Sequence, residues 1–382
     1  MMRSAILAGL TILALSSAPV LSDGVKIGVI APLSGAGAAW GVALTEGVRF
    51  AVEDLNAKGG VTVKGKKEKV ELIAYDDQYK ASEAVAAYNR MVKQDGIKYM
   101  VVMGSAATMA LKPTIQDDDV LVLTGAYTSK AIEADTTNII RLLSTPKEYI
   151  PPLIKWIKTN VQGQRVAIIN PNDEAGWDIL KYSSEAYEKE GYQVLAKELT
   201  ERTQKDFQSL MTRLVAMKPD IIDLGGLSPT TLGLAVRQAR DLGYTKAFVA
   251  MGGPGPREVV AAAGAQAAEG MISILYADPA NDNYQALVER FRKKIGQLPN
   301  EYIVPPYDAA TVLLTAMELS GDPGDVQKVK AAFAKALPMK SLQGQELTFG
   351  GKESIGIDAQ IMTVNIIGRL KGGEPVAVGL AR

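Results

Sequence analysis

Residues 25–60 read VKIGVIAPLSGAGAAWGVALTEGVRFAVEDLNAKGG, and this stretch decides the fold class. Residues 25–31 form a run of apolar and β-branched residues, which is typical of a buried strand. Residues 36–57 follow a helical period and end before Gly59 and Gly60, which stop a helix. A buried strand followed by an amphipathic helix is the first half of a βαβ unit. The stretch therefore predicts a parallel sheet covered by helices.

The same alternation continues along the whole chain. In the first half we expect strands at residues 70–75, 99–103 and 120–124, with helices at 81–94 and 109–116. After Thr145 and Pro146 we expect strands at 165–170, 192–199, 220–224 and 247–251, with helices at 150–159, 175–189, 207–217 and 230–242. The tail adds two helical stretches, 307–319 and 326–336, and one strand-like stretch, 360–367. These pieces are additions to existing sheets, so the predicted fold class is α/β with two doubly wound parallel-sheet lobes.

Composition restricts the function. The chain has 382 residues, which at roughly 150 residues per domain corresponds to two or three domains. Lys and Arg number 42 and Asp and Glu number 42, so the formal charge is zero and nucleic acid is not an expected partner. The chain contains no His and no Cys, which excludes His- or Cys-ligated metals, thiol catalysis and Ser-His-Asp triads. We expect no metal, no cofactor and no catalytic residue.

The N-terminus has the anatomy of a secretory signal. Residues 1–3 carry a positive charge, residues 4–15 are apolar, and residues 16–22 are mostly small. The apolar stretch is shorter than the ~20 residues that a membrane span needs. We therefore expect residues 1–22 to be a signal peptide, cleaved after Ser22, and the protein to act in the periplasm.

A glycine-rich segment follows the first strand. Residues 32–41, PLSGAGAAWG, differ by one place from the dinucleotide fingerprint G-x-G-x-x-G, because Trp40 stands where the third glycine should be. Asp76 and Asp77 end the second strand and could contact a ribose, so a secreted NAD-dependent enzyme is a remote alternative. The sequence has no G-x-x-x-x-G-K-[ST] and no G-x-S-x-G, which argues against an ATPase and an α/β-hydrolase.

Small and hydroxylic residues follow three predicted strands of the first half. They are Ser34-Gly35, residues 104–108 (GSAAT) and residues 125–129 (GAYTS). At the carboxyl edge of a parallel sheet, helix N-termini present free N–H groups and a positive dipole end to an anion. Each hydroxyl could instead cap its own helix. Three such turns in one lobe favour a binding site for a small carboxylate.

At this point the chain resembles a family, the solute-binding proteins of branched-chain amino acid (Leu/Ile/Val-type) ABC importers, which have the type I periplasmic binding fold. The resemblance extends from Val25 nearly to the C-terminus. It is carried, in order, by KIGVIAPLSG (26–35), WG (40–41), NAKGG (56–60), YDD (75–77) and QARDLG (238–243).

The resemblance implies a domain organisation. The chain would cross between the lobes at three hinges, near residues 143–145, 276–277 and 343–347. Lobe 1 would then comprise residues 23–144 plus 277–344, and lobe 2 residues 145–276 plus 345–382.

The resemblance also implies a ligand site between the lobes. The turn 104–108 would hold a carboxylate, Ala126 and Thr128 would meet the carboxylate and ammonium, and Tyr307 would close over the ligand side chain. Trp40 would flank the ligand, or be a core residue. The residues expected to contact ligand are Trp40, Ser105, Ala106, Thr108, Ala126, Tyr127, Thr128, Ala175, Trp177, Asp223, Gly253 and Tyr307.

One departure from the family concerns the ligand. Amino acid binders of this family place a glutamate after the strand expected at 247–251, where it pairs with the ligand ammonium. Here residues 252–256 read GGPGP, and the first acid is Glu258. A buried ammonium without a counter-charge is costly. Either Asp223 replaces the glutamate, or the ligand is an aromatic or aliphatic acid without an ammonium group.

The sequence thus predicts a periplasmic solute-binding component of an ABC importer. It would close two lobes on a small carboxylate ligand and deliver it to a membrane permease and its ATPase subunits, without catalysing a reaction. The ligand would be an amino acid of branched-chain type or an aromatic or aliphatic acid. An extracellular ligand-sensing protein of the same fold is the alternative.

Overall fold

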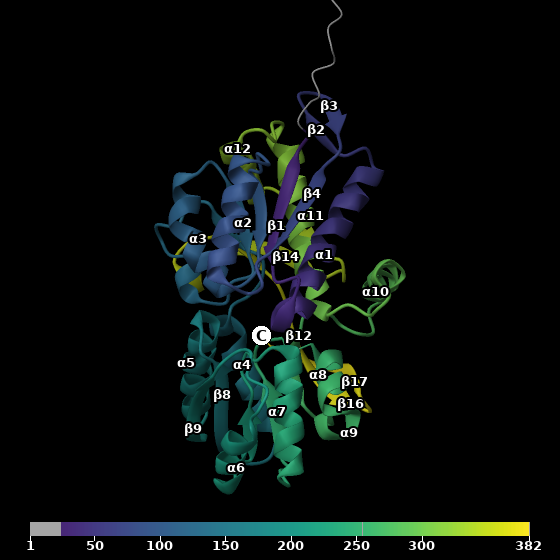
Figure 1. Ribbon diagram of the computed structural model, residues 1–382. Coiled ribbons are helices and arrows are strands. Elements are labelled where there is room, and N and C mark those ends of the chain that lie inside the picture. Colours follow the sequence, from purple (N-terminus) through teal and green to yellow (C-terminus); the bar gives the residue numbers. More distant parts are fainter. Residues whose placement is uncertain (1–23, 254, 382) are drawn as a thin grey trace, which may run out of the picture.

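The structure is a computed structural model that describes residues 24–253 and 255–381. It consists of two lobes, which lie one above the other in Figure 1, each built around its own sheet. The predicted α/β class with two lobes of parallel-rich sheet is confirmed. The signal peptide expected at residues 1–22 lies outside the described residues.

The first lobe is built on an eight-stranded sheet of order β13-β14-β15-β7-β6-β5-β1-β4. Its strands are β1 (Lys26–Ala31), β4 (Glu71–Asp76), β5 (Tyr99–Val102), β6 (Leu121–Thr124), β7 (Ile139–Arg141), β13 (Met339–Lys340), β14 (Glu346–Gly350) and β15 (Gln360–Met362). Its helices are α1 (Ala38–Ala57), α2 (Ala81–Lys93), α3 (Ser105–Asp117), α10 (Asp282–Ile295), α11 (Val304–Ser320), α12 (Val326–Phe333) and α13 (Lys352–Ile355). Short 3₁₀ turns η1 (Gly35–Gly37), η2 (Ser129–Ala131) and η3 (Glu301–Ile303) and the hairpin of β2 (Val61–Val63) and β3 (Lys66–Glu68) complete it.

The second lobe is built on a seven-stranded sheet of order β17-β16-β12-β11-β10-β8-β9. Its strands are β8 (Arg165–Pro171), β9 (Gln193–Thr200), β10 (Ile221–Asp223), β11 (Ala247–Ala250), β12 (Ile272–Leu275), β16 (Asn365–Lys371) and β17 (Glu374–Ala381). Its helices are α4 (Pro146–Asn160), α5 (Glu174–Lys189), α6 (Gln208–Ala216), α7 (Pro229–Asp241), α8 (Pro256–Ala263) and α9 (Ala265–Ala268). In both sheets the strands from the C-terminal tail add antiparallel pairs to a parallel centre.

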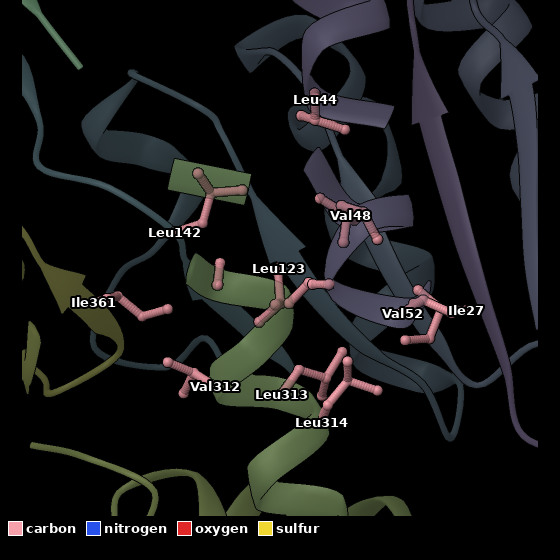
Figure 2. Close-up of a cluster of buried hydrophobic side chains, with 14 of the residues drawn as sticks. Ile27, Leu44, Val48, Val52, Leu123, Leu142, Val312, Leu313, Leu314 and Ile361 are labelled. Atoms are coloured by element: carbon pink, nitrogen blue, oxygen red, sulfur yellow. The ribbon is translucent and has the colours of Figure 1, made fainter. Parts of the chain in front are cut away.

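Helices cover both faces of the first sheet because successive strand residues point to opposite faces. Val29 packs toward α1 and α11, and Ile30 packs toward α2 and α3. Figure 2 shows the first of these cores, in which Leu44 and Val48 of α1 belong to one cluster with Leu313 of α11. This packing holds the carboxyl ends of the first sheet's parallel strands toward the other lobe.

The chain passes between the two sheets three times, and the third passage corrects the prediction. The passages lie between Arg141 and Pro146, between Leu275 and Asp282, and between Met362 and Asn365. A third hinge at 343–347, with lobe 2 resuming at residue 345, is therefore wrong. The expected strand at 360–367 is two strands, of which β15 pairs with β7 and buries Ile361 in the first core, as Figure 2 shows.

Other elements differ from the sequence-based expectation in ways that matter for the site. The helix expected at 109–116 begins at Ser105, so the turn 104–108 is already the first turn of α3. Strands β7 and β12 and helix α10 were not predicted. Among the helices of residues 24–253 and 255–381, none is both long enough and apolar enough to span a bilayer.

Candidate ligand-binding site

A cavity of about 460 Å³, counted with its open mouth, lies between the two lobes. Both lobes contribute to its lining, which consists of Trp40, Tyr79, Met103, Gly104, Ser105, Gly125, Tyr127, Ala175, Ile179, Arg202, Gly226, Gly252, Gly253, Tyr276 and Tyr302. Five of these side chains are aromatic, and one, Arg202, is charged. No carboxylate belongs to this lining among the residues that the structure describes.

The first lobe presents a hydroxyl at the start of α3. Gly104 has φ 91°, a conformation that glycine adopts readily and that turns the chain sharply from β5 into α3. The Ser105 Oγ accepts hydrogen bonds from the backbone N–H groups of Tyr127 at 3.0 Å and Thr128 at 3.1 Å. A serine oxygen has two lone pairs and one proton. Because both lone pairs are occupied, the hydroxyl proton is the group that Ser105 can give to a ligand.

The second lobe presents a guanidinium. Arg202 follows β9, and its Nε donates to Asp173 Oδ2 at 2.7 Å while Nη1 donates to the Gly226 carbonyl at 3.0 Å. Its guanidinium also lies over the rings of Tyr79, at 4.7 Å, and Trp40, at 6.0 Å, both of which belong to the first lobe. Burial lowers the pKa of Arg202, but Tyr79 and Asp173 outweigh it and hold this pKa above the ordinary value. Arg202 is therefore a permanent cation at the cavity wall.

The segment after β11 closes the cavity with backbone rather than with an acid. The Gly253 carbonyl accepts a hydrogen bond from Trp40 Nε1 at 3.2 Å, and the Gly252 carbonyl accepts one from the Tyr127 hydroxyl at 3.2 Å. Glu258, the first acid beyond this segment, accepts from Asn300 at 3.1 Å and does not line the cavity. The carbonyls at the family's glutamate position thus already bind aromatic side chains of the other lobe.

The structure brings five of the twelve expected ligand residues together in the cavity. These are Trp40, Ser105, Tyr127, Ala175 and Gly253. Their positions are set by the starts of α1, α3 and α5 and by the ends of β6 and β11. This is the crevice at the carboxyl edge of each parallel sheet, where small ligands bind in open α/β folds.

Four expected residues near α3 lie behind the cavity wall instead. Thr108 is fully buried, and its hydroxyl donates to the Gly104 carbonyl at 2.8 Å and lies 2.6 Å from Thr124 Oγ1. The Ala126 N–H also bonds to Thr124 Oγ1, at 3.0 Å. Thr128 and Ala106 are likewise absent from the lining, Ala106 lying on a small adjoining recess. The helix starts at Ser105, four residues earlier than expected. Thr108 is therefore already part of α3, and its side chain is buried inside the lobe.

The other three expected residues are occupied elsewhere. Asp223 is fully buried, and its Oδ1 accepts the Gly225 N–H at 2.8 Å, while burial raises its pKa to about 7. Trp177 is 49% exposed and donates to Asn172 Oδ1 at 2.9 Å. The Tyr307 hydroxyl donates to Asp54 Oδ2 at 2.8 Å. None of the three lines the cavity.

Sequence reasoning missed six side chains that line the cavity, namely Met103, Ile179 and four aromatic or charged ones. Tyr79 stands two residues beyond the YDD motif, and Arg202 lies just beyond the strand expected at 192–199. Attention to every predicted strand end would have found both. Tyr276 lies in the second passage between lobes and Tyr302 in η3, where no sequence signal marks a binding role. No group of three or more Asp and Glu side chains is placed to hold a metal ion in the described part of the chain.

Comparison with known proteins agrees with this geometry. The family model described as periplasmic binding protein matches residues 24–373. The leucine-, isoleucine-, valine-, threonine- and alanine-binding protein of Pseudomonas aeruginosa is 28% identical over 336 residues, which is 86% of this chain and 87% of that protein.

Solved structures share the fold at lower identity. The leucine-binding protein of Thermotoga maritima superposes with a TM-score of 0.80 and 22% identity, covering 94% of this chain and 99% of the other. A solute-binding protein of an ABC transporter from R. palustris, solved with benzoate, superposes with a TM-score of 0.77 and 19% identity, covering 94% and 96%. The family match spans most of the chain and includes both lobes and the cavity between them. The chain therefore belongs to the periplasmic binding protein family.

Proposed function

We propose that this protein is the periplasmic solute-binding component of an ABC importer, and that its ligand is a small carboxylic acid without an amine, above all an aromatic acid. One observation carries the proposal. The cavity between the lobes offers a hydroxyl donor and a guanidinium, and no carboxylate of the described residues lines it.

The polar groups suit an anion. The Ser105 hydroxyl lies at the start of α3, where free N–H groups and the helix dipole favour a negative charge. Arg202 carries a full positive charge, and its bonds to Asp173 and Gly226 leave some of its five N–H groups for other acceptors. A ligand carboxylate would thus receive hydrogen bonds from charged or dipole-assisted donors, which are stronger than neutral ones.

The apolar groups suit a flat ring. Trp40, Tyr79, Tyr127, Tyr276 and Tyr302 supply five aromatic rings to the lining. Aromatic pairs prefer offset-stacked or edge-to-face contacts and gain free energy beyond simple burial. Gly125 allows one of these rings to approach closely, because a Cβ there would lie 2.3 Å from the Tyr302 hydroxyl. An aromatic acid would fill such a cavity better than a branched aliphatic side chain.

A ligand ammonium would lack a counter-charge. Asp223, the one substitute that the sequence offered, is sealed inside the second lobe. The carbonyls of Gly252 and Gly253 already accept hydrogen bonds from Tyr127 and Trp40. Unpaired buried charges are strongly unfavourable. The relatives named for leucine, isoleucine and valine therefore support the transport role, and the relative solved with benzoate supports the ligand class.

The mechanism is a hinge motion with no chemical step. Three chain passages connect the lobes, and ligand contacts from both lobes form together only when the lobes meet. The closed, loaded protein would then dock on a membrane permease served by ATPase subunits. Residues 1–22 would direct the chain to the periplasm and be removed, which intact-mass measurement of the periplasmic fraction tests by a product beginning at Asp23.

The ligand class is tested by calorimetry on protein that has been unfolded and refolded to remove co-purified ligand. The probes are benzoate, 4-methylpentanoate, which is leucine without its amine, leucine and phenylalanine. We expect the two acids to bind and each amino acid to bind at least tenfold more weakly than the matching acid.

The Asp223→Asn variant shows how to interpret tight binding of leucine, which would be contrary to this expectation. Tight leucine binding that disappears in this variant would show that the ammonium reaches Asp223 and would restore the amino acid interpretation. Tight leucine binding that survives the substitution would show another counter-charge. Either result overturns the proposed ligand class.

A further inference from the structure

A buried cation of the first lobe lies behind the ligand cavity. Arg141 ends β7, and its side chain is fully buried. Its Nη2 donates to the Thr128 carbonyl at 2.8 Å, Nη1 lies 3.4 Å from Gln360 Oε1, and Nε has no hydrogen-bond partner among the described residues. A buried cation is unfavourable unless opposite charge lies close by. Arg141 has no carboxylate partner within 4.0 Å in the part of the chain that the structure describes.

The carboxylates that act on Arg141 both come from the second lobe. Burial lowers the pKa of Arg141 to about 10, and the charges of Glu148 and Asp178 oppose that shift. Glu148 lies in the first turn of α4, and Asp178 lies in α5. The first lobe thus holds the cation, and the second lobe holds its counter-charges.

Glu148 lies at the hinge. Its side chain accepts hydrogen bonds from the Thr145 N–H at 2.7 Å, from Ser354 Oγ at 2.7 Å and from Gln360 Nε2 at 2.8 Å. Because it stands three residues past Thr145, in the first passage between the lobes, it remains near Arg141 when the lobes rotate. Gln360 lies between the two charged groups and bonds to both.

Asp178 is held away from the hinge by α5 and reaches the first lobe across the cleft. Its Oδ2 accepts hydrogen bonds from the Ser129 N–H at 2.6 Å, Ser129 Oγ at 2.9 Å and Thr128 Oγ1 at 3.3 Å. All three donors belong to the first lobe. Opening the cleft would separate Asp178 from these donors and from Arg141, while leaving Glu148 in place.

Thr128 connects this contact to the ligand site. Its N–H bonds to Ser105 Oγ, its carbonyl accepts from Arg141, and its hydroxyl donates to Asp178. The same residue therefore bonds to the serine that faces the cavity and to the side chain that reaches over from the second lobe. Thr128, expected as a ligand contact, is instead the link between the two.

We propose that Asp178 is a positioning residue for lobe closure: its carboxylate, brought against Ser129 and Thr128 when the cleft closes, fixes Thr128 behind Ser105 and adds negative charge on the side of buried Arg141. Closure and ligand capture are thereby coupled through one carboxylate that does not touch the ligand. The inference rests on the proposed function only in that the lobes open and close, and it holds for any ligand.

The central variant is Asp178→Asn, which keeps the shape and one acceptor oxygen but removes the charge. Two controls separate the possible causes. Glu185→Gln removes an exposed charge from the same helix, and Ser129→Ala removes one hydrogen bond to Asp178 but keeps its charge. Thermal unfolding of each variant checks that the fold is retained.

Small-angle X-ray scattering of refolded protein with no ligand added decides the inference without reference to ligand class. We expect Asp178→Asn to have a larger radius of gyration than the wild type, Glu185→Gln to match the wild type, and Ser129→Ala to lie between them. An Asp178→Asn radius equal to that of the wild type overturns the proposal. Equal expansion of Ser129→Ala and Asp178→Asn would assign the effect to the hydrogen bond and overturn the role of charge.

Stopped-flow dissociation of benzoate supplies a second readout. We expect Asp178→Asn to release benzoate about tenfold faster, with a smaller change in the association rate, because a weaker closed state opens more often. An unchanged release rate contradicts the proposal. If benzoate binds to none of the proteins, the ligand class has failed, and the scattering result still tests the closure inference.

Discussion

The guanidinium of Arg202 lies over the ring of Tyr79, 4.7 Å from its centroid, and so joins the second lobe to the first at the wall of the ligand cavity. Cation–π contacts of this kind strengthen when water is excluded from them. Asp173 fixes the guanidinium from the opposite side, in its own lobe. The cavity is thus bordered by a positive charge that contacts both lobes.

Replacing Arg202 should weaken ligand binding. We expect Arg202→Gln to lower benzoate affinity at least tenfold in calorimetry, because the variant loses the positive charge and the stack on Tyr79. Arg202→Lys should recover only part of the affinity, since lysine cannot reproduce the planar fork. The matched control is Arg213→Gln, whose exposed pair with Glu198 should contribute little. Equal affinities of Arg202→Gln and Arg213→Gln would contradict the assignment.

Substitutions at Ser105 and Thr108 should differ in their effect on ligand binding. Ser105→Ala removes the hydroxyl that faces the cavity, and a hydrogen bond to a charged group is worth about 1.5–3 kcal/mol, so benzoate affinity should fall at least tenfold. Thr108→Val removes a hydroxyl that bonds only inside the lobe. It should leave affinity within threefold and lower the free energy of unfolding by about 1–3 kcal/mol, measured in urea. A larger affinity loss for Thr108→Val would return Thr108 to the binding site.

Asp223 should make the protein less stable as the pH rises. Its pKa is about 7 in the folded protein against an ordinary 3.8, so the folded state binds this proton more tightly than the unfolded chain. The stabilisation is complete below the ordinary pKa and is lost as the pH rises through about 7. Asp223→Asn cannot ionise and keeps an oxygen for the Gly225 N–H. Its melting temperature, relative to the wild type, should therefore rise between pH 4 and pH 8.

The control for this pH series is Asp135→Asn, at an exposed position. Its melting temperature should keep a constant difference from the wild type across the series. A constant difference for Asp223→Asn as well would show that Asp223 does not titrate in this range.

Gly41 and Gly176 should not tolerate a methyl group. A Cβ on Gly41 would lie 1.9 Å from the Pro32 carbonyl oxygen, and a Cβ on Gly176 would lie 1.9 Å from the Pro171 carbonyl oxygen. Each glycine lets the first helix after a strand approach that strand's end closely. We expect Gly41→Ala and Gly176→Ala each to lower the free energy of unfolding by about 1–3 kcal/mol or more.

Gly65→Ala is the comparison for these two variants. Gly65 has φ 80° and open space around it, so alanine there suffers only the backbone cost, about 1–2 kcal/mol. A loss at Gly41 no greater than the loss at Gly65 would show that the backbone at Pro32 moves aside at little cost.

The sequence was informative wherever local patterning decides the structure. Strand and helix periods predicted β1, α1 and most of the parallel core, because β1 is an unbroken apolar run buried on both faces and α1 packs against it with an apolar face. The C-terminal tail was harder, since Ile361 and Ile367 look alike in sequence, yet Ile361 packs in the first core and Ile367 in the second. Only the three-dimensional partners of these two residues decide that the strand is divided.

The candidate site was predictable to the extent that it follows strand ends. Ser105 and Trp40 face the cavity, as strand-end reasoning expected for small polar turns and as the family resemblance implied. Thr108 and Asp223 also stand close to strand ends, but their side chains point inward. Thr108 lies in the first turn of α3, and Asp223 bonds to the buried turn at Gly225. Tyr276 and Tyr302 reach the cavity from segments distant in sequence, which no local pattern reveals.

The C-terminal residues complete both sheets at once. Strands β13, β14 and β15 add to the first sheet, and β16 and β17 add to the second, all from residues 339–381. A chain that still lacks this segment leaves β7 at the edge of the first sheet and β12 at the edge of the second. Protein domains ordinarily fold one after another as they leave the ribosome. Here the strands that finish both sheets lie in the same late segment, so the order of synthesis places the completion of both lobes after residue 339.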